Sequence, residues 1–133
     1  MLDKLADSEA YKLIEQEAVL VDLDLFDYLI PAENGCIDSQ LALIAVFEKG
    51  LGAQCSLRLQ AYFEDKLFET TDDNRVKLGI IWNQALKAGR RGRYDEMKKG
   101  FNKAIDFMQM EMPMEDWDFE LFEYMELYTQ GAE

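Results

Sequence analysis

The chain has 133 residues, 49% of them hydrophobic, and no Pro-, Gly- or Ser-rich linker, which predicts one folded domain over residues 1–133 and excludes intrinsic disorder. Its formal net charge of -13 repels nucleic acid and anionic membranes at long range, so we expect neither as a direct partner. Histidine is absent, and Cys36 and Cys55 lack a metal-binding spacing, which removes the commonest catalytic base and argues against a zinc site or a disulfide scaffold.

The first nine residues carry acidic side chains where a secretory signal would carry a basic region and then an apolar run. The longest apolar stretch, residues 41–47, is far shorter than the roughly 18 residues that a membrane-spanning helix needs. We therefore expect a cytoplasmic protein without a membrane span.

A first helix is expected over about residues 7–17, with Ser8 as its N-cap. Residues 20–30 are ambiguous, because their apolar positions fit both the alternation of a strand and the spacing of a helix. We predict a helix there, since a lone strand could not satisfy its backbone, and we expect Pro31 and the Asn34-Gly35 turn to end it.

The next helix is expected to begin at a cap formed by Asp38 or Ser39. Its residues 41–47 are apolar on all sides, which predicts a central, buried helix that ends at Gly50 and Gly52. A further helix is expected over about residues 53–69. Its apolar stripe consists of Leu59, Phe63 and Leu67.

Residues 71–73 form an expected N-cap for a helix over residues 76–88, and an amphipathic helix follows over residues 93–110. The core stripe of this second helix is expected to contain Tyr94, Met97, Phe101, Ala104, Ile105 and Met108. After Pro113, a last helix is expected over about residues 116–129. The pattern predicts an all-α protein, a compact bundle or short antiparallel helix-pair stack of about five or six helices.

The segment Gly92-Arg-Tyr94-Asp-Glu-Met97, followed by Phe101 and Ala104-Ile105, resembles the second helix of a tetratricopeptide repeat. The resemblance covers about a dozen residues. The preceding helix offers Ala85 at the small-residue position but lacks the Gly and Tyr of the repeat, and no second copy occurs at the repeat interval of about 34 residues. We do not assign the chain to this family.

Charge is distributed unevenly along the chain. Residues 1–40 hold 10 acidic and 2 basic residues, and residues 104–133 hold 9 acidic and no basic residues. Residues 75–103 reverse the balance, with 2 acidic and 9 basic residues. Within these residues, we expect the basic groups from Lys87 to Lys103 to pair with acidic groups and not with nucleic acid. Nucleic-acid binding uses aromatic side chains that stack on bases, and the one nearby aromatic, Tyr94, is predicted to lie in the core.

The expected last helix combines large apolar side chains with glutamates. Trp117, Leu121, Tyr124, Met125 and Tyr128 form a stripe that can pack on the bundle, whereas other apolar residues lie off it among acids. Aromatic anchors surrounded by carboxylates suit the binding of a basic protein. The alternative is that the off-stripe residues contact a second packing neighbour. The proposed partner-binding residues are Phe119, Glu120, Phe122, Glu123, Glu126 and Leu127.

A search for catalytic or metal-binding patterns yields none that is specific. Carboxylate pairs such as Asp72-Asp73 are expected by chance in so acidic a chain, and Asp22, Asp24 and Asp27 lack the glycine and terminal glutamate of a calcium loop. Cys36 has no nearby basic group and is interpreted as an inert thiol. We predict that the protein is not an enzyme and has no cofactor, metal or catalytic residue.

Two functions remain open at this point. The first is an acidic inhibitor of the immunity, anti-restriction or nucleic-acid-mimic type, which occludes a basic partner such as a toxin or a nucleic-acid-binding protein. The second is a helical adaptor or secretion-type chaperone that holds a peptide in an apolar groove. Acidic surface that serves solubility alone is the simpler explanation of the charge, and the oligomeric state is left open.

Overall fold

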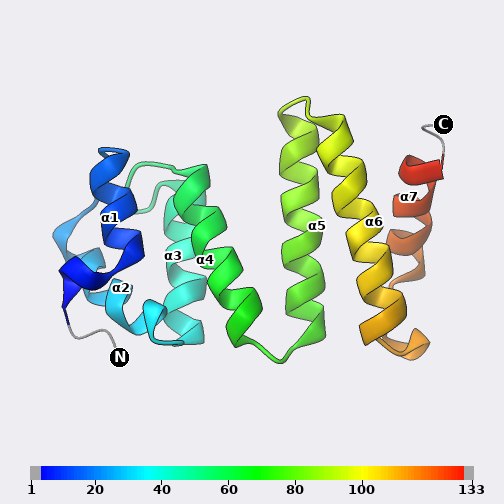
Figure 1. Cartoon of the computed structure of the whole chain (residues 1–133), viewed down its shortest axis with the longest axis horizontal. Coiled ribbons are helices and arrows are strands. Elements are labelled where there is room, and N and C mark those ends of the chain that lie inside the picture. The colour runs from blue at the N-terminus through cyan, green and yellow to red at the C-terminus, as the bar shows by residue number, and fades with distance from the viewer. Residues whose placement is uncertain (1–3, 131–133) are drawn as a thin grey trace. The chain divides into compact units, whose positions relative to one another are not determined.

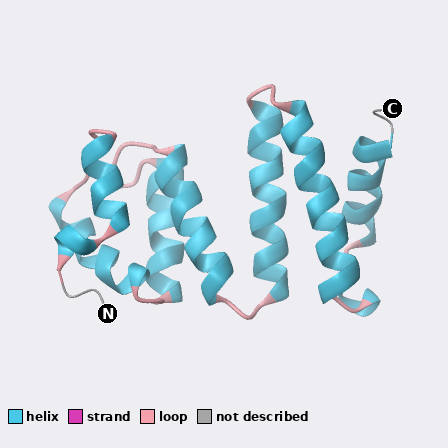
Figure 2. Ribbon diagram, in the orientation of Figure 1, coloured by secondary structure: helices cyan, strands magenta, loops and turns pink. Residues whose placement is uncertain are grey.

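A computed structural model describes residues 4–130 (Figures 1 and 2). Within this range it contains seven α-helices, three short 3-10 helices and no strand, so the all-α prediction is confirmed with slightly more helices than expected. The chain divides into two compact units, Met1–Thr71 and Asp72–Glu133, called unit 1 and unit 2 below. One domain over residues 1–133 stays a prediction, and each unit is described by itself.

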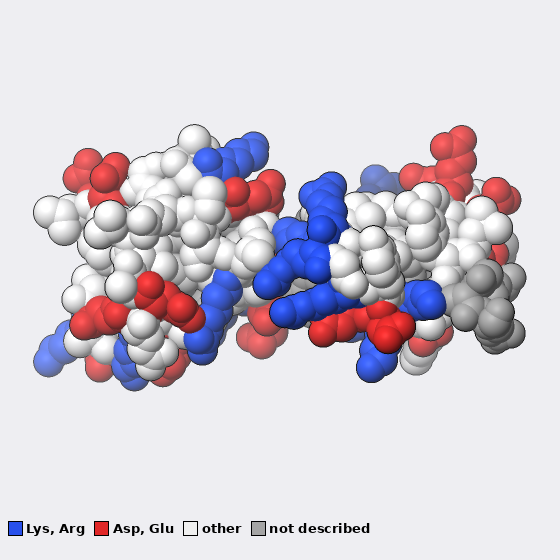
Figure 3. Space-filling model, turned by 90° about the horizontal axis from the view of Figure 1, so that it is seen from above, with Lys and Arg blue, Asp and Glu red and all other residues white. Residues whose placement is uncertain are grey.

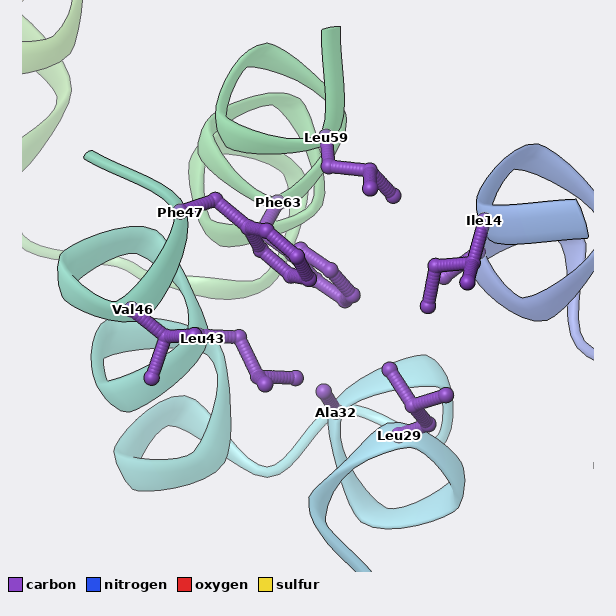
Figure 4. Close-up of a cluster of buried hydrophobic side chains, with 9 residues drawn as sticks. Ile14, Leu29, Ala32, Leu43, Val46, Phe47, Leu59 and Phe63 are labelled. Atoms are coloured by element: carbon purple, nitrogen blue, oxygen red, sulfur yellow. The ribbon is translucent and has the colours of Figure 1, made fainter. Parts of the chain in front are cut away.

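Unit 1 is built around the antiparallel pair α3 and α4, with α1 and α2 packed beside it (Figure 1). Phe47 of α3 and Phe63 of α4 stack at its centre with ring centroids 6.2 Å apart and planes 3° from parallel (Figure 4). Burial of such side chains contributes roughly 1.5–3 kcal/mol each. The elements are η1 (Leu5–Asp7), α1 (Glu9–Gln16), η2 (Leu23–Leu25), α2 (Phe26–Glu33), α3 (Ile37–Lys49) and α4 (Leu57–Thr70).

Two of the predicted helix ends in unit 1 are confirmed. The Ser8 hydroxyl accepts a hydrogen bond from the backbone N–H of Tyr11 and caps α1. Gly50 ends α3 with a φ of 73°, a left-handed conformation that favours glycine. The predicted cap of α3 was wrong, because the helix begins earlier. Cys36 is its N-cap residue, and Ser39 lies inside the first turn.

The prediction for residues 20–30 was wrong at both ends. Val21 forms an isolated antiparallel bridge with Ala53, which supplies the partner that a strand was expected to lack. Pro31 does not end α2, which continues to Glu33. Proline removes one backbone donor from the helix interior, but the N–H of Asn34 still donates to the carbonyl of Ile30 at 3.0 Å, so the last turn closes.

The α3–α4 pair also departs from the expectation of a wholly buried helix. Leu43, Val46 and Phe47 are buried, but Leu41 is 48% exposed, because α3 is covered on part of its circumference only. The helix predicted from residue 53 starts at Leu57, since residues 52–54 are engaged with residues 20–22. The predicted α4 stripe, Leu59, Phe63 and Leu67, is buried as expected.

A buried carboxylate joins three helices of unit 1. Glu33, at the end of α2, has a side chain only 3% exposed. It accepts hydrogen bonds from the Ser8 hydroxyl and the Ala10 N–H at the start of α1, and from the Tyr62 hydroxyl of α4. Lys66 Nζ lies 3.9 Å from the same carboxylate. These partners compensate for burying a charged group.

Unit 2 consists of the antiparallel hairpin α5 (Asn74–Arg90) and α6 (Tyr94–Glu111), then η3 (Met114–Asp116) and α7 (Phe119–Gln130) (Figure 1). Asp73 caps α5, as predicted for residues 71–73, by accepting from the Arg75 N–H. The two helices of the hairpin approach closely where Gly100 faces Ala85. No described helix is both long and apolar enough to cross a membrane.

The predicted stripe of α6 is largely confirmed. Its buried members are Met97, Phe101, Ala104 and Met108. Tyr94 was wrongly placed in the core. It is the first residue of α6, next to the turn that joins α5 and α6, and it is 61% exposed.

Candidate partner-binding surface

The start of α7 is fixed to the end of α6 by Trp117. Its indole N–H donates to the carbonyl oxygens of Met108 and Met112, at 3.1 and 3.0 Å. The Met108 carbonyl also accepts from the Met112 N–H, so the indole adds to the hydrogen bonds at the end of α6. The Asp118 carboxylate accepts a hydrogen bond from the Leu121 N–H in the first turn of α7. These contacts determine which face of α7 turns inward.

The inward face of α7 is aromatic. Met125 is fully buried, and the rings of Tyr124 and Tyr128 lie 6.1 and 5.7 Å from the ring of Phe101 in α6. A hydrogen bond with Tyr128 is the largest cause that raises the pKa of Tyr124. Both tyrosines remain about 40% exposed, so they form the border between the core and the outer face.

The outward face of α7 carries Phe119, Glu123 and Leu127 at intervals of four residues, which places them on one side of the helix. Phe119 is 51% exposed and Leu127 is 72% exposed, while Glu120 and Glu123 are also exposed. These four residues are called the α7 outer face below. Exposed apolar groups flanked by carboxylates are the arrangement that the sequence predicted for binding.

The other two predicted binding residues lie differently. Phe122 is half-buried and stacks on Trp117, with ring centroids 5.0 Å apart and planes 23° from parallel. Glu126 is also half-buried. Phe122 therefore contributes to the attachment of α7, and the side chains best placed to reach a partner are those of the α7 outer face.

The turn between α5 and α6 forms a second charged surface in unit 2. Arg90, Arg91 and Arg93 are exposed there beside Tyr94, and Figure 3 looks onto this end of the unit, where Lys and Arg side chains gather. Arg93 lies 3.8 Å from Glu96, whereas no described carboxylate is within ion-pair distance of Arg90 or Arg91. The exposure of Tyr94 removes one argument that the sequence offered against an anionic partner here.

Cys36 has a hydrogen-bond partner that its sequence context did not show. The thiol is exposed, and the Ser39 hydroxyl donates a hydrogen bond to its sulfur at 3.3 Å. This hydrogen bond is the main cause that lowers the pKa of the Cys36 thiol. Ser39 lies three residues after Cys36 on the first turn of α3, a helical spacing that brings its hydroxyl to the sulfur.

Within residues 4–130, no group of three or more acidic or cysteine side chains is arranged to hold a metal ion. No family model, curated protein or solved structure matches the chain. We therefore infer function from the surface chemistry of the two units.

Proposed function

We propose that this protein is a non-catalytic binding protein that occludes a basic surface of another protein with the α7 outer face. The observation that carries the proposal is the exposure of Phe119 and Leu127, at 51% and 72%, among glutamates. Large apolar side chains in solvent gain roughly 1.5–3 kcal/mol each when a partner buries them. The carboxylates around them would select a basic partner and speed its association.

The acidity of α7 supports a binding role over a purely structural one. Glu120, Glu123 and Glu126 follow one another at intervals of three residues, and residues 104–133 contain no Lys or Arg to compensate them. Like charges at this spacing disfavour a helix by roughly 0.2–0.5 kcal/mol per pair. If α7 served only to pack on the rest of unit 2, these three carboxylates would have no reason to stand close together on it.

The form of occlusion that fits best is inhibition of a basic toxin or nucleic-acid-binding protein, as immunity, anti-restriction and nucleic-acid-mimic proteins perform it. The outer face of a single helix is convex and suits insertion into a cleft, whereas a peptide-holding adaptor presents a groove. We place this activity in the cytoplasm, where the two exposed free thiols, Cys36 and Cys55, would stay reduced.

The test is affinity capture from host and competitor extracts with Leu127→Ser, using Met110→Ser of α6 as a matched control. Met110 is 79% exposed, so both changes remove a solvent-exposed apolar side chain of unit 2 without disturbing its core. We expect Leu127→Ser to weaken capture roughly 10- to 100-fold and Met110→Ser to leave it unchanged. Equal capture by both variants would exclude the α7 outer face.

A second comparison separates inhibition from groove binding. Reversing Glu120, Glu123 and Glu126 to Lys should abolish capture of a basic partner, and capture by the unchanged protein should fall steeply as salt rises. A partner retained at high salt and by the charge-reversed protein would support an adaptor that binds an apolar peptide.

A further inference from the structure

Unit 1 contains a short antiparallel pairing of two connecting segments, residues 20–22 before α2 and residues 52–54 before α4. The Asp22 N–H donates to the carbonyl of Gly52 at 2.8 Å, and the Gln54 N–H donates to the carbonyl of Leu20 at 2.9 Å. The Gln54 side chain also accepts from the Leu20 N–H. These hydrogen bonds fix the register of the two segments.

The central residues of the pairing leave their backbone groups open. In this hydrogen-bonding pattern the N–H and C=O of Val21 and of Ala53 point away from each other. Neither residue forms a backbone hydrogen bond with any other described group. Each segment therefore presents an open strand edge, with one donor and one acceptor spaced to pair with a residue of an added extended chain.

Exposed leucines surround this edge. Leu23 directly follows the paired residues 20–22 and Leu51 directly precedes the paired residues 52–54, and these side chains are 82% and 58% exposed. Leu20 is 70% exposed. A hollow of about 330 Å³, open to solvent, is lined by Leu20, Val21, Asp22, Gly52, Ala53 and Gln54. The edge thus combines open backbone groups with apolar side chains that an added chain would cover.

The charge of this edge is acidic. Residues 15–27 contain five acidic residues and no Lys or Arg. Glu17 is paired with Arg58 at 2.7 Å, but Asp22 and Asp24 are exposed and form no ion pair with any described residue. A chain that pairs with Val21 would lie beside these two carboxylates.

We propose that the edge at Val21 binds an extended, basic and apolar peptide segment of a partner protein by strand addition. The open N–H and C=O of Val21 would pair with an extended backbone of the partner. The exposed leucines favour apolar side chains in that segment, and Asp22 and Asp24 favour Lys or Arg among those side chains. A second copy of this chain fits poorly, because it would bring its own acidic edge against this one. The site lies in unit 1 and does not depend on the α7 outer face.

The test uses a synthetic peptide in which lysine alternates with valine, added to the full-length protein. Amide hydrogen exchange is followed at Val21 and Ala53. We expect rapid exchange at Val21 in the free protein and strong slowing when the peptide binds, because its N–H gains a hydrogen bond. A peptide N-methylated at alternate residues on the pairing edge should bind at least roughly tenfold more weakly, since it cannot complete the ladder.

Leu23→Ser and Asp24→Lys are the test variants, and Leu41→Ser is the control. Leu23 and Leu41 are both exposed leucines of unit 1, but Leu41 lies on α3 away from the bridge. We expect each test variant to weaken peptide binding roughly tenfold or more and the control to leave it unchanged.

Three results would overturn the proposal. The first is unchanged exchange at Val21 with saturating peptide. The second is equal binding of the N-methylated peptide, which would mean contact through side chains only. The third is amide exchange at Val21 that slows as the protein concentration rises in the absence of peptide, together with a dimer in sedimentation. This result would assign the edge to a second copy of the chain.

Discussion

Tyr62 and Glu33 form the shortest side-chain contact that joins α4 to α2 in unit 1. The Tyr62 hydroxyl lies 2.6 and 2.7 Å from the two carboxylate oxygens of Glu33. Burial first, and then the hydrogen bond and the charge of Glu33, raise the pKa of Tyr62 well above its usual value of 10.0. Folding therefore favours the protonated phenol.

The raised pKa of Tyr62 has a definite effect on the pH dependence of stability. The protonated Tyr62 hydroxyl contributes fully to the free energy of unfolding below the unfolded-state pKa of about 10. This contribution is lost as the pH rises above that value, because only the unfolded chain then releases the proton. We expect Tyr62→Phe to lower the free energy of unfolding by about 1–2 kcal/mol at pH 8. The loss should shrink above pH 10. Urea unfolding followed by far-UV circular dichroism measures both, with exposed Tyr94→Phe as the control, and a pH-independent difference would contradict the assignment.

Cys36 gives a second prediction at the scale of single residues. The Ser39 hydroxyl lowers the pKa of the Cys36 thiol through its hydrogen bond, so Ser39→Ala should raise that pKa and reduce the thiolate fraction near neutrality. We expect slower alkylation by iodoacetamide at pH 7.5 in a Cys55→Ser background. The two proteins should converge at high pH, where both thiols are ionised. Identical pH–rate profiles would show that the hydrogen bond does not act on the sulfur.

Among the elements, the α5–α6 hairpin depends on the absence of a side chain at Gly100. A Cβ at this position would lie 2.6 Å from the Cβ of Ala85, whereas a Cβ at Gly79 on α5 would meet nothing within 4 Å. We expect Gly100→Ala to destabilise unit 2, because overpacking costs about 1–3 kcal/mol against a gain in helix propensity of at most about 1 kcal/mol. Gly79→Ala should be stabilising by roughly 0.5–1 kcal/mol.

Tryptophan fluorescence is the measurement for this pair of variants. Trp82 stacks on Phe101 between α5 and α6 with ring centroids 5.3 Å apart, and Trp117 also belongs to unit 2. The urea midpoint should fall for Gly100→Ala and rise for Gly79→Ala. A rise for both would mean that the helices separate readily at Ala85 and that the close approach is not required.

Helices could be predicted where apolar residues recur on one face and where the capping residue directly precedes the helix in the sequence. The stripe on α4 and most of the stripe on α6 follow from residue spacing, and Ser8 and Asp73 cap the helices that they precede. Residues 20–22 could not be predicted, because their pairing depends on residues 52–54, more than thirty positions away. The exposure of Tyr94 and Leu41 had the same cause, since spacing identifies an apolar face but not how far the neighbouring helix extends.

The candidate binding residues were separated only by three-dimensional packing. The sequence placed Phe119 and Leu127 off the packing stripe of the last helix and proposed Phe119, Phe122 and Leu127 alike as apolar anchors for a partner. The structure stacks Phe122 on Trp117 and leaves Phe119 and Leu127 exposed. The Trp117 ring reaches Phe122 because its indole N–H is held by the end of α6, a contact that no sequence pattern encodes.

At the scale of the whole molecule, both units carry excess negative charge. Residues 1–71 hold 14 acidic and 5 basic residues, and residues 72–133 hold 13 and 9. A charge of this size attracts a basic partner over a distance set by the Debye length, about 10 Å at 0.1 M salt and about 3 Å at 1 M. Long-range attraction acts on the association rate, whereas contacts made by α7 act on the dissociation rate.

Two single charge reversals distinguish these effects. Glu123→Lys changes the α7 outer face, and Glu15→Lys changes an exposed residue of α1 in unit 1 by the same amount of charge. With the captured partner, we expect both variants to associate more slowly at low salt, by a few-fold, and to converge with the unchanged protein near 1 M salt. Only Glu123→Lys should also dissociate faster, because only its carboxylate would contact the partner. Stopped-flow association and surface-based dissociation measure the two rates, and faster dissociation of Glu15→Lys would place the interface on unit 1 instead.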